Sequence, residues 1–152
     1  MAYQKNVVRK HAVMPFDPEK PELPKAEDEG WLPLAKAIET IEDDSDEDTD
    51  DHAFYDGDGT SQTVLNSRSE VWNFSGYYDP SDPAQKLIAS LRRNISDEGR
   101  YIWHKIVETN GDTVIGLAKA MEIKAGGGDA NEYEDFEGHL DFIKTPTVAP
   151  KA

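Results

Sequence analysis

The segment from Arg68 to Tyr78, which reads RSEVWNFSGYY, decides the fold class of this chain. Trp72, Phe74 and Tyr78 fall on one parity of the segment, and polar residues mostly fill the other. Successive side chains of a β-strand point to opposite faces, so this alternation is typical of a strand with one face buried. The segment therefore predicts a β-sheet with one apolar face.

Three further strands are predicted downstream, at residues 100–109, 113–125 and 133–144. Asn110-Gly111-Asp112 separates the first two and is typical of a short hairpin turn; Gly126–Asp129 is a looser turn before the third. The last strand has two distinct faces. Its apolar parity holds Phe136, Gly138, Leu140 and Phe142, and its polar parity holds Asp135, Glu137, His139 and Asp141. These strands predict an antiparallel meander with an apolar and an acidic face.

One helix is predicted at about residues 82–94. Asp82 can cap its N-terminus, Pro83 suits the first helical position, and Gln85 completes a spacing like that of a capping box. The apolar stripe that would pack on the core consists of Ala84, Leu87, Ile88 and Leu91.

The rest of the chain is predicted to be mostly irregular. The first thirty residues form a partly extended, proline-rich arm after one short strand at residues 7–14, and residues 146–152 form a flexible tail. A strand is slightly preferred to a helix at residues 31–41. Residues 42–62 are predicted as a long acidic loop, because like charges at this density oppose collapse. Its candidate inter-subunit residues are Glu42, Asp43, Asp44, Asp46, Glu47, Asp48, Asp50 and Asp51.

Length and composition limit the function. The 152 residues suit a single domain, here a mainly β (α+β) one: an antiparallel β-sandwich or barrel-like domain with one flanking helix. The lack of cysteine excludes disulfides and thiolate chemistry. A net charge of −15 disfavours a grip on nucleic acid or anionic lipid. We also expect a soluble protein, since no signal peptide or membrane-spanning stretch is recognised.

No catalytic or cofactor site is predicted. The four histidines His11, His52, His104 and His139 are scattered, without metal-ligand spacing. The acids around residues 46–60 invite a calcium hypothesis, but no Asp-x-Asp-x-Asp-Gly loop with a later bidentate Glu is present. We therefore expect no enzyme, cofactor or dedicated metal site.

The order of these segments resembles that of the tail tube (major tail) proteins of long-tailed bacteriophages. The residues behind the resemblance lie at 54–60 (FYDGDGT), 72–76 (WNFSG), 82–85 (DPAQ) and 126–131 (GGGDAN), before the strand that ends in Phe142. The resemblance implies six subunits in a ring, stacked rings forming a tube for DNA ejection, and tape measure and tail terminator proteins as partners. It implies a place in the virion tail, after assembly in the host cytoplasm, without a membrane.

The resemblance also gives the acidity a physical purpose. A basic wall would hold duplex DNA by counterion release, whereas an acidic wall lets it slide without specific binding. The candidates for the lumen are therefore Asp135, Glu137, His139 and Asp141, although an outward-facing strand is an open alternative. A second reading from another class also fits the charge: an acidic binding module, such as a DNA-mimic inhibitor of a basic nucleic-acid enzyme.

Overall fold

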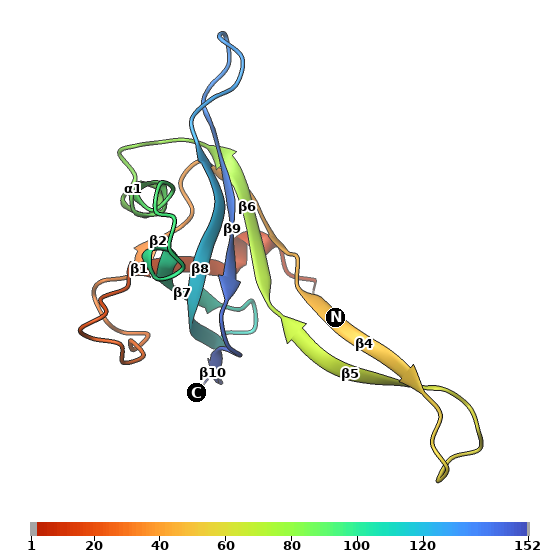
Figure 1. The fold of residues 1–152 in the computed structure, drawn as a ribbon. Coiled ribbons are helices and arrows are strands. Elements are labelled where there is room, and N and C mark those ends of the chain that lie inside the picture. The colour runs from red at the N-terminus through yellow and green to blue at the C-terminus, as the bar shows by residue number, and fades with distance from the viewer. Residues whose placement is uncertain (1–2, 152) are drawn as a thin grey trace.

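A computed structural model of the chain, which describes residues 3–151, consists of one curled antiparallel sheet, one α-helix and a separate two-stranded hairpin (Figure 1). The sheet order is β2-β1-β7-β8-β9-β6-β3, and β10 also pairs with β8. The elements are η1 (Asn6–Val8, a 3₁₀ helix), β1 (Lys10–Pro15), β2 (Leu32–Pro33), β3 (Ile38–Asp43), β4 (Asp46–His52), β5 (Gln62–Ser69), β6 (Val71–Tyr77), α1 (Pro83–Ser90), η2 (Glu98–Arg100, 3₁₀), β7 (Tyr101–Val107), β8 (Thr113–Ala125), β9 (Asp135–Phe142) and β10 (Thr147–Ala149).

The predicted antiparallel, β-dominated architecture is confirmed, and β7, β8 and β9 form the expected meander. β8 has the predicted bounds. Gly111 adopts a φ of +97° in the turn between β7 and β8, which explains a glycine there. Of the sandwich and the barrel, the structure is closer to the barrel: a single sheet curls into half of one. β3 and β2 are its two end strands.

The concave apolar face of the sheet and the helix α1 enclose the core. The buried residues come from β1, β6, β7, β8 and β9, from the helix and from the residue after β2: Val13, Leu34, Trp72, Phe74, Ala84, Ile88, Ile102, Ile106, Val114, Ala118, Ala120, Phe136, Leu140 and Phe142. Phe74 and Phe136 stack with ring centroids 5.2 Å apart. The alternation that predicted the buried face of residues 68–78 is thus confirmed for Trp72 and Phe74, within β6.

The helix begins as predicted and ends early. The backbone N–H of Gln85 donates to Asp82 Oδ2 over 3.2 Å, which confirms the cap. The helix stops at Ser90 instead of residue 94. After Ser90 the chain continues in tighter turns, in which the N–H groups of Leu91, Arg92 and Asn94 donate to carbonyls three residues earlier, and the carbonyls of Arg92 and Asn94 accept from the Arg100 guanidinium over 2.8 Å each.

The packing face of the helix was predicted in part. Ile88 is fully buried, and Leu87 and Leu91 pack against the core while partly exposed. Gln85 was expected at the cap but is also fully buried. Its side chain accepts from the N–H of Asp79 (2.7 Å) and donates to the carbonyls of Lys36 (2.9 Å) and Tyr77 (3.1 Å). It therefore ties the helix to the segment before β3 and to the end of β6.

The prediction of an N-terminal arm needs correction. β1 lies within the sheet, paired with both β2 and β7. Residues 16–31 are irregular, as expected, but are anchored to the outer face of the sheet by two aromatic side chains. Phe16 lies 5.4 Å from Tyr101 and 5.7 Å from Trp103 between ring centroids, and Lys105 Nζ lies 5.1 Å from the centre of the Trp31 ring. The periodicity of residues 7–14 could not show these long-range pairings.

Two further predictions of irregular structure are wrong. The acidic loop expected at residues 42–62 contains the end of β3 and all of β4, which pairs with β5. The tail expected at residues 146–152 contains β10, which pairs with the first residues of β8. In both cases the strand gains its hydrogen bonds from a partner strand, β5 for β4 and β8 for β10, and these outweigh a poor intrinsic strand propensity. The segment at residues 31–41 is split between β2 and β3, with Ala37 at a φ of 62° between them.

Candidate assembly surfaces

The β4–β5 hairpin projects far from the body of the protein (Figure 1). Its strands pair from Asp46 opposite Ser69 to His52 opposite Gln62. Every residue from 46 to 69 is exposed except Val64, which is partly covered. A lone two-stranded hairpin is only marginally stable in water. Contact with another molecule would therefore stabilise the β4–β5 hairpin.

The hairpin carries an uneven distribution of charge. Its first strand holds Asp46, Glu47, Asp48, Asp50 and Asp51, whereas the second holds a single cation, Arg68. Arg68 lies 3.4 Å from Glu47 and 3.3 Å from Glu70. The eight predicted inter-subunit acids are thus divided: Glu42 and Asp43 end β3, Asp44 lies in the connection, and five lie on β4.

The base of the hairpin is held to the body by local hydrogen bonds. The N–H of Asp44 donates to the carbonyl of Val71 over 2.8 Å, and the N–H of Ser45 donates to Asp43 Oδ1 over 2.9 Å. Partial burial raises the pKa of Asp43, but the Ser45 hydrogen bonds and the charges of Arg68 and Arg9 outweigh it, so the pKa is lowered overall. This carboxylate stays charged and fixes the point where β3 passes into β4.

The polar face of β9 is the second candidate surface. Asp135 and Glu137 are exposed, and His139 and Asp141 are half-buried. Phe136, Leu140 and Phe142, on the opposite parity, are buried. The predicted separation of an acidic and an apolar face is confirmed, and the four candidate lumen residues share one face.

Neighbouring strands turn this face into a shallow trough of about 430 Å³. It is lined by residues of four adjacent strands: Thr40, Glu42, Asn73, Phe74, Ser75, Glu122, Lys124, Glu137, Gly138 and His139. Glu122 has a φ of 50° in an irregularity of β8 between Met121 and Lys124. Such bulges redirect side chains, and here Glu122 Oε2 lies 3.8 Å from His139 Nε2.

The trough is less uniformly acidic than β9 alone. Lys124 Nζ lies 3.4 Å from Glu137 Oε1, and the His139 ring also contacts the carboxylate of Asp141. Lys119 is the register partner of Asp141 but reaches Asp97 at 3.5 Å. The sequence did not predict that the β8 lysines lie beside these acids. Cross-strand neighbours depend on the register between two strands, and the pattern of one strand does not reveal that register.

Two histidines form a buried pair in the core. His11 Nδ1 and His104 Nε2 are 3.1 Å apart and share a hydrogen bond, and His104 Nδ1 has no partner. Burial, aided by the charge of Arg9, lowers the pKa of His11 to about 4. Burial and the neighbouring His11 lower the pKa of His104 well below its usual value. Both rings are therefore neutral near pH 7, and their role is packing against Trp72 and Phe142.

Among residues 3–151, no three His, Asp or Glu side chains gather in a way that could hold a metal ion. Within the same residues, no helix has the length and apolar character needed to cross a bilayer. The prominent features of the described residues are two surfaces, the hairpin and the trough.

No protein-family profile matches the sequence, and no curated protein is significantly similar to it. Solved structures do match. A chain from the tail of an empty gene transfer agent particle, determined with C6 symmetry, superposes with a TM-score of 0.67 at 14% identity, over 99% of this chain and 100% of that one. This chain therefore has the fold of that phage-like tail chain.

Two further structures share this fold. A chain from the virion of a native gene transfer agent particle gives a TM-score of 0.68 at 12% identity, over 97% of this chain and 100% of that one. A chain from the tube-terminating cap of the anti-feeding prophage gives a TM-score of 0.52 at 14% identity, over 99% of this chain and 94% of that one. Since both gene transfer agent chains are covered in full, the likeness extends to the whole fold and not to the meander alone.

Proposed function

We propose that this protein is a non-enzymatic structural subunit that assembles into six-membered rings, which stack into the tube of a phage-like tail. The main support for this proposal is the match over 97–99% of the chain to the two gene transfer agent structures, one of them a tail determined with C6 symmetry. The tube would conduct DNA during ejection. Its partners would be tape measure, terminator and cap proteins, and its location the virion tail.

The unpartnered surfaces of the monomer support self-assembly. β3 ends the sheet, and an open end strand offers unpaired backbone groups that a neighbour's sheet would satisfy. The exposed hairpin extends beyond the body and would reach a neighbouring subunit or ring. In this proposal its acids, from Asp46 to Asp51, are inter-subunit residues.

The trough on the polar face of β9 is proposed as part of the lumen wall. The acids facing it outnumber the lysines, so its surface would repel the phosphates of passing DNA. The ion pair of Lys124 with Glu137 keeps one cation from acting as a free phosphate ligand. A wall of this composition favours sliding over binding.

The DNA-mimic inhibitor is the rival function, and the acidic hairpin is the observation in its favour. Sedimentation velocity of the purified protein over a wide concentration range separates the two. The tube predicts ring-sized and larger species of the protein alone, growing with concentration. A monomer or dimer at every concentration, with a stable complex only on adding a basic protein, would support the inhibitor.

A further inference from the structure

A groove of about 260 Å³ lies between the N-terminal segment and the edge of the sheet near β3. Its apolar lining includes Val7, Leu34, Ile38 and Ile41. The complete lining also contains Asn6, Arg9, Lys10, His11, Pro33, Ala35, Glu39 and Thr40. It is a largely apolar groove with Lys10 and Arg9 on one rim, where Arg9 is also ion-paired with Glu108 over 3.1 Å, and with Glu39 as its one acid.

That rim belongs to an unusually basic part of the chain. The first sixteen residues contain Lys5, Arg9 and Lys10 and no Asp or Glu, although the chain as a whole carries a net charge of −15. The side chains around the rim are open to solvent: Val7 is 72% exposed and Val8 is 43% exposed. The groove and its rim thus combine apolar surface with positive charge.

The tip of the β4–β5 hairpin has the complementary chemistry. Tyr55 is fully exposed and Phe54 is 46% exposed. A turn in which the N–H of Gly57 donates to the carbonyl of Phe54 over 3.1 Å holds the two aromatic residues at the end of the ribbon. Between residues 46 and 61 the chain contains seven acids and no Lys or Arg.

We propose that Phe54-Tyr55 at the hairpin tip of one copy docks into this groove of a second copy. An apolar cavity of about 150 Å³ holds a benzene molecule, so 260 Å³ has room for an aromatic side chain. The hairpin acids would face the cationic rim.

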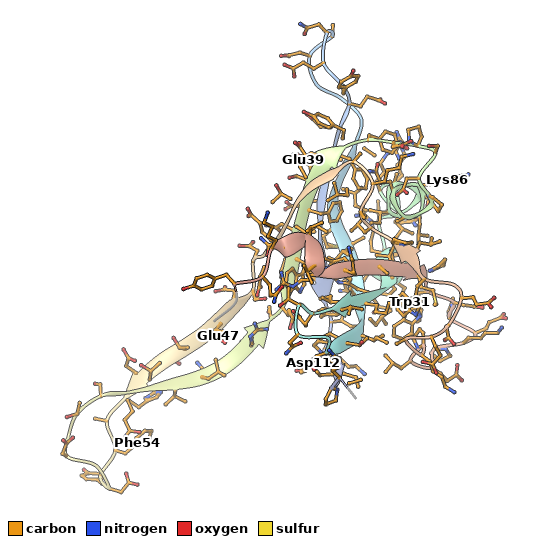
Figure 2. All side chains as sticks on the ribbon, turned by 180° about the vertical axis from the view of Figure 1, so that it is seen from behind. Trp31, Glu39, Glu47, Phe54, Lys86 and Asp112 are labelled. Atoms are coloured by element: carbon orange, nitrogen blue, oxygen red, sulfur yellow. The ribbon has the colours of Figure 1, made fainter. Side chains whose placement is uncertain are left out.

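The occupant must come from another copy. Figure 2 shows Phe54 at the far end of the hairpin, well away from Glu39 at the groove, so a tip does not reach the groove of its own chain. A tip and a groove are different surfaces, and such heterologous contacts extend into rings or filaments instead of closing a dimer. The inference rests on the proposed self-assembly and specifies one of its interfaces.

Cross-linking between single-cysteine variants tests the contact, since the natural chain has no cysteine. Ala53→Cys, which keeps both docking aromatics, is mixed with a size-tagged Ala35→Cys, whose exposed residue lines the groove. A short bis-maleimide is then added at an assembling concentration. The matched control replaces Ala35→Cys by Lys86→Cys on the exposed face of α1, where Arg92 and Arg93 follow closely in sequence. Negative-stain images of each sample show whether tubes have formed, independently of the cross-linking result.

Docking would raise the local thiol concentration to about the millimolar range, so the tip–groove heterodimer should exceed the control by about tenfold or more. Tubes without that heterodimer, or with equal cross-linking to Lys86→Cys, would overturn the tip–groove contact while leaving the proposed function intact. If neither tubes nor the heterodimer formed, both the tip–groove contact and the proposed function would be overturned.

Discussion

Excising the hairpin should abolish assembly while leaving the monomer as stable as before. Asp46 and Ser69 face each other in register, so residues 47–68 can be replaced by Asn-Gly. This dipeptide favours the two-residue turn that suits a tight hairpin. The variant keeps β3, β6 and the whole core.

The expected effect on monomer stability follows from exposure. Among the hairpin residues only Val64 is partly covered, and its partial burial is worth at most about 1 kcal/mol. Removing four like charges from β4 acts in the opposite direction. We therefore expect the free energy of unfolding to change by less than about 1 kcal/mol.

Urea unfolding followed by tryptophan fluorescence measures this change, because Trp31, Trp72 and Trp103 all lie outside the excised segment. Light scattering on the same samples reports assembly. A loss of more than about 2 kcal/mol would mean that the hairpin belongs to the folded body. Wild-type assembly by the excised variant would refute its role between subunits.

Three other substitutions or conditions test the core and the trough. Gln85→Ala removes the partners of three backbone groups and should lower the free energy of unfolding by about 3 kcal/mol in urea titrations. The pKa of His11 and of His104 is lowered in the folded protein, so the unfolded chain takes up protons first as the pH falls below about 6.5. The contribution of these histidines to the free energy of unfolding should be fully present above that pH. The free energy should fall by about 3 kcal/mol for His11 alone as the pH reaches about 4, and urea unfolding across the pH range measures this fall. Glu137→Lys, which places a free cation in the trough and breaks its ion pair, should slow or block DNA delivery by assembled particles.

Each of these has a matched control. Lys86→Ala, at the exposed neighbour of Gln85, should leave stability nearly unchanged, and an equal loss in both variants would contradict the account of Gln85. His52→Asn removes an exposed histidine and should keep the wild-type pH dependence; a stability independent of pH down to about 4 would contradict the buried neutral pair. Glu29→Lys adds the same charge outside the trough and should leave DNA delivery unchanged. If Glu137→Lys also left delivery unchanged, the lumen assignment would be ruled out.

Local patterns predicted the parts of the fold in which each strand or turn depends on its own residues. The bounds of β8, the cap at Asp82 and the two faces of β9 all follow from periodicity or turn chemistry. The burial of Gln85 did not, because its three partners come from segments that meet only in the folded protein.

The acidic segment shows most clearly what a local pattern leaves out. Asp and Glu are poor strand formers, so residues 46–52 favoured a loop, yet β4 forms because β5 supplies its ladder. The candidate lumen residues were correctly placed on one face, but Lys119 and Lys124 were missed. Their positions beside Asp141 and Glu137 depend on the register of β8 with β9.

Negative-stain electron microscopy of the purified protein at high concentration tests the central claim of self-assembly most directly. The account predicts hollow rings with six-fold symmetry in end views and striated tubes in side views, formed without any other protein. Isolated monomers or dimers at every concentration, including after addition of preformed tail initiation complexes, would contradict it.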